Sequence, residues 1–246
     1  MTGNAIPIRY PRRRLVRGLL RLGIRLAFPL FAEIDVQGQE NLPGEGPLLI
    51  VGNHFHFLDP VAVILATRWH LEFIGGVRRP GAPATVSWFA DVWGVLPAYR
   101  GSVARSTLLA AKAVLAQGGV MVIFPEGGSW ASVLRPPRPG AAFVATTVKA
   151  PILPVGLDGM TEVFPMFRQG KRARVTIRFG QPFGPFYVSE SGESDRQRLE
   201  ELGHVMMRRV AELIPPERRG FYSDDPAIRA AAKGTEMYPW ADKPEG

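Results

Sequence analysis

The residues best suited to chemistry lie in the segment VGNHFHFLDP, residues 51–60. His54 follows an apolar run, and Asp59 comes five residues later, directly before Pro60. A histidine beside a carboxylate is the orienting half of a general-base pair, because the carboxylate fixes the imidazole tautomer and stabilises the imidazolium. Asp59 before Pro60 also suits the N-cap of a helix, and it could serve both roles.

His56 adds a second histidine to the same segment. His54, His56 and Asp59 could form a two-histidine, one-carboxylate metal site, but no further ligand is evident. We therefore expect no metal, and we expect His56 to pack or to contact an acceptor. His70 and His204 have no acidic partner in a suggestive place, so we interpret both as structural or surface residues.

A second candidate segment is MVIFPEGGSW, residues 121–130. Glu126 and Gly127 follow an apolar strand pattern. Glycine lets a backbone approach a ligand closely, and the Glu126 carboxylate could bond a hydroxylated substrate. An ordinary turn with an exposed glutamate is the alternative.

A third candidate segment is GVLPAYRGSVAR, residues 94–105. Ser102 suits the N-cap of a following helix. A helix N-terminus flanked by Arg100 and Arg105 would make a phosphate site. Two solvated arginines are the alternative interpretation.

Several common catalytic patterns are missing from the sequence. It has no G-x-S-x-G, H-E-x-x-H, G-K-S/T phosphate loop or G-x-G-x-x-G. This argues against an α/β-hydrolase, a zincin, a P-loop enzyme and a dinucleotide enzyme. Cysteine is absent, which excludes disulfides, thiolate metal sites and a cysteine nucleophile.

Short apolar runs alternate with helical stretches along the chain. The expected strands are Ile34–Gln37, Leu48–Gly52, Leu71–Ile74, Val95–Ala98, Val120–Phe124, Ile152–Gly156 and Val175–Phe179. The expected helices are Pro60–Arg68, Ala84–Val92, Val103–Gln117, Ala141–Lys149 and Asp195–Leu213. This alternation predicts a single α/β domain with a mixed, mostly parallel sheet flanked by helices.

The charge is concentrated at the N-terminus. The 246 residues carry a net charge of +8, yet residues 1–32 hold seven arginines and no acidic residue, so the rest of the chain is nearly neutral. We therefore divide the chain into a basic segment 1–32, a catalytic domain 33–214, and a C-terminal segment 215–246 that is an extended tail or a loosely docked helix. No apolar run reaches 18 residues, so no conventional spanning helix is expected.

The basic segment is expected to form an amphipathic helix between Pro11 and Pro29. Two series of residues at helical spacing define its faces: Arg14, Arg17, Arg21 and Arg25 on one, and Leu15, Leu19, Leu22 and Leu26 on the other. The leucines suit the acyl boundary of a bilayer and the arginines suit anionic head groups. A core-packing helix is the next interpretation; a secretory signal and a nucleic-acid arm fit less well.

Taken together, these segments resemble the glycerophospholipid acyltransferase family. Four motifs carry the resemblance in order over roughly residues 33–185: N-H-x-x-x-x-D at Asn53, His54 and Asp59; the spaced pair Gly94 and Arg100; F-P-E-G at residues 124–127; and P-x-x-P-V at Pro151, Pro154 and Val155. The basic segment is similar to the membrane-attached N-terminal element of that family.

The resemblance implies transfer of a fatty acyl group from acyl-CoA or acyl-carrier protein to a lysophospholipid hydroxyl, with 1-acyl-glycerol-3-phosphate as the first acceptor. It implies that His54 is the base, that Asp59 orients it, that Arg100 binds phosphate, and that Glu126 with Gly127 positions the acceptor. No covalent enzyme intermediate and no cofactor beyond the acyl donor are implied. The place of action would be the cytoplasmic face of a membrane, with the protein peripheral or monotopic.

Two departures from the family pattern bear on the acceptor. T-R-S is expected after F-P-E-G, but residues 128–130 are Gly-Ser-Trp, and the residues before Arg100 also differ. Arg105, Arg135 or Arg138 could replace the missing arginine; otherwise we expect an amino-acid lipid, a glycolipid or another hydroxylated lipid as the acceptor. A catalytically silent lipid-binding protein and, least favoured, a nucleic-acid binder are the other hypotheses.

Overall fold

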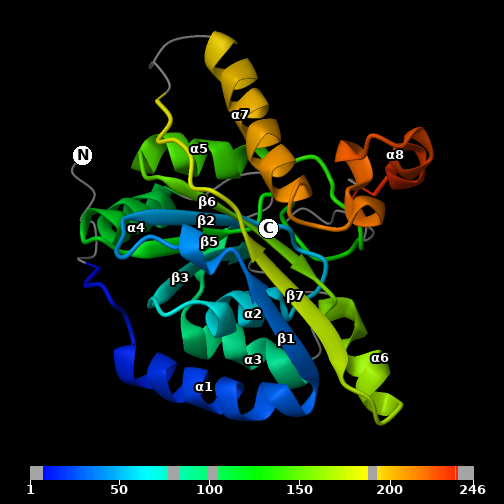
Figure 1. Cartoon of the computed structure of the whole chain (residues 1–246). Helices are drawn as coiled ribbons and strands as arrows, with labels where there is room; N and C mark the ends of the chain where they lie inside the picture. Colours follow the sequence, from blue (N-terminus) through cyan, green and yellow to red (C-terminus); the bar gives the residue numbers. More distant parts are fainter. Residues whose placement is uncertain (1–7, 77–83, 99–104, 188–192, 236, 238–246) are drawn as a thin grey trace.

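A computed structural model describes residues 8–76, 84–98, 105–187, 193–235 and 237. Its centre is one seven-stranded sheet with the order β1-β7-β6-β2-β5-β3-β4 (Figure 1). The strands are β1 (Ala32–Gln37), β2 (Leu48–Gly52), β3 (Leu71–Gly76), β4 (Leu96–Ala98), β5 (Val120–Ile123), β6 (Ile152–Asp158) and β7 (Ala173–Phe179).

The strands that flank the candidate site run parallel to one another. β2 pairs in parallel with β5 and with β6, whereas β6 and β7 pair antiparallel. β2 is the central strand, and all five of its residues are buried. Its sequence LLIVG is a continuous apolar run because helices cover both faces of the sheet.

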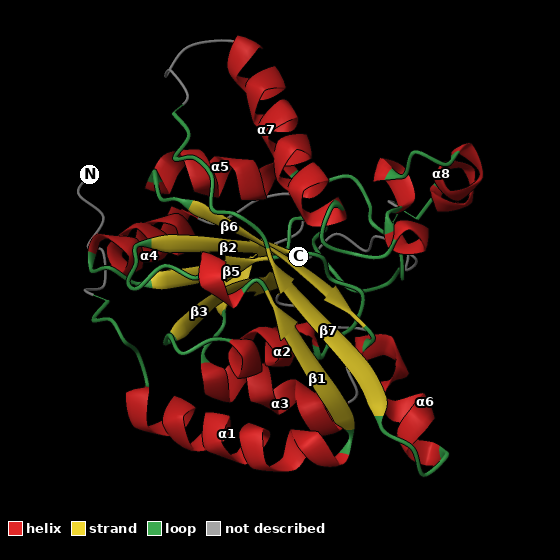
Figure 2. Ribbon diagram, in the orientation of Figure 1, coloured by secondary structure: helices red, strands yellow, loops and turns green. Residues whose placement is uncertain are grey.

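Two groups of helices cover the two faces (Figure 2). One group is α4 (Arg105–Ala116), α5 (Pro139–Val148) and α7 (Glu193–Ala211); the other is α1 (Arg14–Ala27), α2 (Asp59–Ala66) and α3 (Ala84–Trp93). Along β2, Leu49 and Val51 join the core under the first group, whereas Leu48 and Ile50 join the core under the second. This alternation follows from the two-residue period of a strand.

The predicted mixed, mostly parallel α/β sheet is confirmed. All seven expected strands are present, with ends that differ by up to two residues, and each expected helix has a counterpart. The sequence did not predict the short helices α6 (Val163–Arg168) and α8 (Pro226–Ala232). Both are under two full turns, and α6 carries Pro165, so neither presents a periodic pattern long enough to detect.

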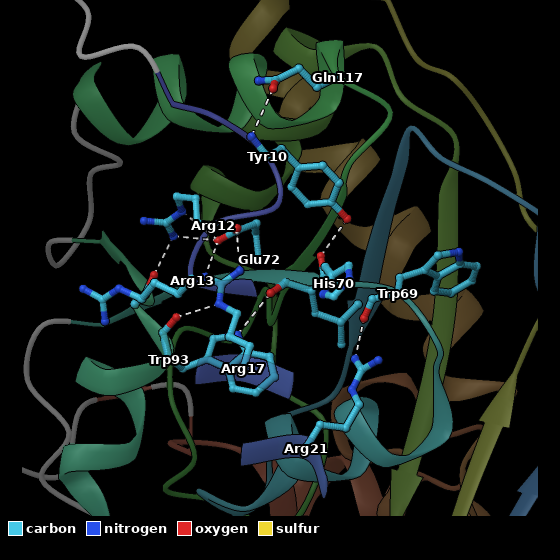
Figure 3. A network of polar contacts seen from close by, with 12 residues as sticks. Tyr10, Arg12, Arg13, Arg17, Arg21, Trp69, His70, Glu72, Trp93 and Gln117 are labelled. Carbon is cyan, nitrogen blue, oxygen red and sulfur yellow. Dashed lines mark hydrogen bonds and ion pairs between the residues drawn. The ribbon is translucent and has the colours of Figure 1, made fainter. Parts of the chain in front are cut away.

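Arg17 and Arg21 of α1 face the protein, which corrects the expectation that the whole arginine row faces lipid head groups (Figure 3). Arg17 is buried, and it donates to both oxygens of the buried Glu72 on β3, at 2.6 and 2.8 Å. Arg12 also pairs with Glu72 at 2.6 Å. Arg21 donates to the carbonyl oxygens of Arg68 and Trp69.

These cations also satisfy the carbonyl groups that end α3. Arg17 Nε donates to the Trp93 oxygen at 2.8 Å, and Arg13 donates to the Asp91 and Val92 oxygens. The last carbonyls of a helix lack partners within the helix and attract positive charge. Arg17, together with Arg12 and Arg13 just before the helix, therefore docks α1 against α3 and β3.

The leucine face of α1 points away from the protein. The side chains on this face are exposed by 83% at Leu15, 71% at Leu19, 54% at Leu22 and 70% at Leu26. Leu20 and Ile24 instead pack against the core. No helix in the described part of the chain is long and apolar enough to cross a membrane.

Part of the C-terminal segment is folded against the domain. After α7, residues 216–222 form two 3-10 turns, and α8 follows with Asp225 as its N-cap. The Leu134 N–H donates to the Arg218 oxygen, and the Phe221 N–H donates to the Leu134 oxygen. These bonds join residues 216–222 to the loop that follows β5.

Candidate active site

The candidate site lies where β2 and β5 end side by side. His54 comes two residues after the end of β2, and Glu126 comes three residues after the end of β5. Because the two strands are parallel neighbours, both loops leave from the same edge of the sheet. The backbone N–H of His54 donates to Oε1 of Glu126 at 2.7 Å, so the structure brings these two predicted residues together.

Asp59 contacts the imidazole of His54. Nδ1 of His54 lies 3.0 Å from Oδ2 of Asp59, whose side chain is 1% exposed. The same oxygen accepts the N–H groups of Phe55 and His56, each at 2.7 Å. Asp59 is the first residue of α2, but no side-chain cap forms there. Its carboxylate holds the His54 loop instead of capping the helix.

This contact sets the chemistry of the second ring nitrogen. With Nδ1–H donated to a carboxylate, neutral His54 carries its lone pair on Nε2. Within the described part of the chain, Nε2 has no recorded hydrogen-bond partner, and the His54 side chain is 17% exposed. The ring also stacks on Phe124, with centroids 4.5 Å apart. A fixed ring with an accessible Nε2 is suited to accept a proton.

Asn53 holds the start of the loop in place. It is fully buried, its amide donates to the Leu157 oxygen at 2.8 Å, and its oxygen accepts the Leu157 N–H at 2.7 Å. The side chain thus takes the place of a backbone group and extends the pairing of β2 with β6 beyond Gly52. The sequence motif included Asn53, but its spacing alone did not predict this role.

Glu126 is buried and bonded to protein groups, and its predicted part in positioning the acceptor stays a prediction. It is 1% exposed, and its oxygens bond the His54 N–H and the backbone and Nε groups of Arg135. Burial raises the pKa of Glu126 to about 7, while Arg135 and the His54 N–H oppose that rise. Gly127 has a φ of +79°, which a residue with a side chain rarely adopts.

The spacing of residues in the sequence did not predict that Arg135 lies at this site. Its side chain is 1% exposed, and its Nε lies 3.0 Å from Oε2 of Glu126. The sequence marked it only as a possible replacement for a phosphate-binding arginine. Glu126 lies nine residues before Arg135 and is followed by two glycines, and this spacing does not indicate that the two side chains pair.

The predicted phosphate site is only partly described. Arg100 and Ser102 lie outside the described residues. Arg105 is the first residue of α4 and is exposed, and no recorded contact joins it to His54 or Glu126.

The remaining histidines have packing or surface surroundings. His56 packs against Phe57, and burial lowers its pKa. His204 Nδ1 lies 2.8 Å from the Tyr222 hydroxyl. Among the described residues no group of three or more His, Cys, Asp or Glu side chains is arranged to hold a metal ion.

A mixed sheet with a histidine–carboxylate pair at the carboxyl edge of its central strands is typical of α/β enzymes. Comparison with known sequences narrows the class. The chain belongs to the acyltransferase family, whose sequence model matches residues 33–158, the region from β1 to the end of β6. Residues 53–59 and 124–127 lie inside this match.

Relatives and a solved structure agree with this assignment. The chloroplastic 1-acyl-sn-glycerol-3-phosphate acyltransferase of Brassica napus is 28% identical over 163 residues, which are 65% of this chain and 47% of that protein. An uncharacterised Mycobacterium tuberculosis protein is 28% identical over 176 residues, 68% of this chain and 48% of that one. The chain thus spans about half the length of the curated relatives it matches.

The fold is that of a known enzyme of this kind. The crystal structure of the 1-acyl-sn-glycerophosphate acyltransferase PlsC from Thermotoga maritima superposes with a TM-score of 0.54 at 24% identity, covering 82% of this chain and 83% of that one. The family and the fold therefore define an acyltransferase domain.

Proposed function

We propose that this protein moves a fatty acyl group from an acyl thioester to a free hydroxyl of a lysophospholipid, with 1-acyl-glycerol-3-phosphate as the first acceptor to test. The observation that carries the proposal is the His54–Asp59 pair, in which Asp59 holds Nδ1 at 3.0 Å and Nε2 remains open among the described groups. A protein that only binds lipid has no need of an oriented base.

The reaction needs one base and no covalent enzyme intermediate. His54 Nε2 accepts the hydroxyl proton as the acceptor oxygen attacks the thioester carbonyl carbon. The C–S bond then breaks, and the imidazolium returns its proton to the leaving thiolate. Asp59 stabilises the imidazolium between these steps. Acyl-CoA and acyl-carrier protein both present the thioester that this sequence requires.

The arginines that would bind an acceptor phosphate are fewer than the sequence suggested. Because Arg135 is paired with Glu126, we do not propose it as the replacement for the arginine that residues 128–130 lack. Arg100, Arg105 and Arg138 are the remaining candidates. This pairing of Arg135 favours one second candidate function, in which the same chemistry acts on a lipid hydroxyl without a phosphate, such as an amino-acid lipid or a glycolipid.

We also propose that the enzyme works on a membrane surface and that the leucine face of α1 contacts the bilayer. Leu15, Leu19, Leu22 and Leu26 are all more than half exposed on one side of a helix whose other side is bound to the protein. Exposed large apolar side chains in a row are typical of an interfacial helix. Arg14 and Arg25 stay exposed on this helix and are available to anionic lipids.

An acyl-transfer assay tests the catalytic proposal. Purified protein on anionic vesicles receives labelled acyl-CoA or acyl-carrier protein and a panel of lyso-acceptors and neutral lipid alcohols. His54→Ala is compared with His70→Ala, a matched change at a histidine outside the site. We expect His54→Ala alone to lose transfer. Equal activity in both variants would refute the role of His54.

The acceptor panel decides between the candidate functions. Transfer to 1-acyl-glycerol-3-phosphate supports the first acceptor, whereas transfer confined to lipids without phosphate keeps the mechanism and supports the second. Absence of transfer from either donor to every acceptor would support the silent lipid-binding hypothesis.

A further inference from the structure

Around Glu126 the chain builds a compact polar unit that the acyl-transfer chemistry described above does not use. Its members are the Arg135 guanidinium, the Trp130 ring and the carboxylate itself. Arg135 Nε donates to Oε2 of Glu126 at 3.0 Å, and its Nη2 donates to the Gly128 oxygen and lies 3.5 Å from the His54 oxygen. The opposite carboxylate oxygen accepts the His54 N–H.

Both backbone polar groups of His54 therefore meet the same ion pair. The N–H meets Glu126 at 2.7 Å, and the carbonyl faces Arg135. Asp59 fixes the imidazole from the other side of the residue. A side chain held at its ring and at its own peptide groups has little freedom to leave the productive position.

Residues 128–130, which depart from the family pattern, include the Trp130 ring on which Arg135 packs; we call this ring the platform for Arg135. The guanidinium carbon lies 3.8 Å from the centre of the Trp130 ring, a cation–π contact. A Cβ at residue 128 would come 2.4 Å from Cζ3 of Trp130, so the glycine at this position makes room for the ring. Gly128 and Trp130 are thus matched to each other and to Arg135.

The C-terminal segment holds this platform. Trp130 Nε1 donates to the Thr235 oxygen at 2.7 Å, three residues beyond α8. The loop residue Leu134, next to Arg135, is bound through both of its backbone groups to residues 218 and 221. Figure 1 shows α8 and the end of α7 beside the sheet, on the side where these loops emerge.

We propose that Arg135, seated on Trp130, is a positioning residue that acts through Glu126 to hold the peptide of His54 in place for proton transfer. This inference rests on the proposed function, because it assigns His54 the role of base. It gives residues 128–130 a role of their own, in place of the phosphate contact that the family pattern would supply there.

Enzyme kinetics on the full chain test the inference. Arg135→Met removes the guanidinium donors and the charge, whereas Arg135→Lys keeps the charge alone. Arg209→Met on α7 is the matched control at an exposed arginine. We expect kcat of Arg135→Met to fall about 10- to 100-fold, as for a displaced catalytic group. The KM values for donor and acceptor should stay within about twofold, and Arg135→Lys should recover part of kcat.

The pH profile separates positioning from simple stabilisation. Among the described residues, the titratable and charged groups that interact with Glu126 are Arg135, His54 and Tyr222. Loss of Arg135 raises the pKa of Glu126 further. The ionised Glu126 carboxylate, which accepts the His54 N–H, then forms only at higher pH. The midpoint of kcat against pH should therefore move upward in Arg135→Met, and it should stay in place in Arg209→Met.

Three results would overturn the inference. One is an unchanged kcat with only a lowered Tm, and another is a raised acceptor KM with an unchanged kcat, which would make Arg135 a substrate contact. The third is an unmoved pH midpoint. If Arg135→Met does not fold, Trp130→Leu against Trp130→Phe decides: we expect the leucine variant to lose kcat and the phenylalanine variant to keep most of it, and equal kcat values would overturn the inference.

His54→Ala in the same experiment separates the two proposals. An active His54→Ala enzyme would refute the proposed function. An inactive His54→Ala enzyme together with a fully active Arg135→Met enzyme would refute only the positioning role of Arg135.

Discussion

Removing Arg17 from its buried pair with Glu72 should destabilise the protein strongly, because the Glu72 carboxylate stays buried, and Arg17→Met tests this. Arg17 makes two bonds to Glu72 and one to the Trp93 oxygen, and both side chains are at most 1% exposed. Removing one partner of a buried pair costs about 3–5 kcal/mol. Arg12 still contacts Glu72 in the variant, so we expect a loss near 3 kcal/mol.

Urea unfolding measures this loss. The midpoint should fall while the slope of the unfolding free energy against urea stays constant. Arg172→Met is the matched control, because its pair with Glu33 is about half exposed on both sides and should contribute at most about 1 kcal/mol. A loss below about 1 kcal/mol for Arg17→Met, or an equal loss for both variants, would refute the docking of α1 through its arginines.

Three further predictions concern other parts of the structure. Leu19→Ser with Leu22→Ser should weaken binding to vesicles about 30- to 1000-fold in a sedimentation assay, since each exposed leucine contributes about 1–2 kcal/mol on burial; unchanged binding would exclude this face. Gly220→Ala should lower the Tm, because its φ is +48° and a Cβ would lie 2.3 Å from the Leu134 oxygen; an unchanged Tm would contradict this. Burial raises the folded-state pKa of Glu126 to about 7, so protonation of this carboxylate should favour the folded state. The free energy of unfolding of the wild type, relative to Glu126→Gln, should therefore rise as the pH falls from 7 to 5, by at most about 1.4 kcal/mol per pH unit. A fall over this range would refute the raised pKa.

The sheet and the His54 loop were predictable because their signals are local. The run LLIVG predicts a covered central strand, and a polar residue directly after such a strand predicts a site at the carboxyl edge. The five-residue spacing of His54 and Asp59 spans a single loop, and the two side chains meet as that spacing suggested.

The orientation of α1 was not predictable from its periodicity. The spacing separates an arginine face from a leucine face, but it does not say which face meets the protein. The buried Glu72 decides the matter, and it lies 55 residues from Arg17 on a strand that otherwise reads as core. On the side of α1 that meets the protein, Arg17 on this buried carboxylate lies beside the inward-facing Leu20 and Ile24.

The burial of Glu126 and its pairing with Arg135 could not be predicted from the sequence either. A glutamate before two glycines suggests an exposed group, whereas its actual burial depends on Arg135 and Trp130, which in turn depend on residues 218–235 at the far end of the chain. Contacts of this range leave no spacing pattern in one sequence.

The central claim is that His54 is the base for acyl transfer, and single-turnover transfer by His54→Ala tests it most directly. Enzyme in excess over labelled acyl thioester would be mixed with lyso-acceptor on vesicles, and both the acylated lipid and the released thiol would be followed. A general base contributes about 10²- to 10⁴-fold, so we predict that the rate falls by at least about 100-fold while the fold and vesicle binding are unchanged. A rate within about tenfold of the wild type would contradict the account.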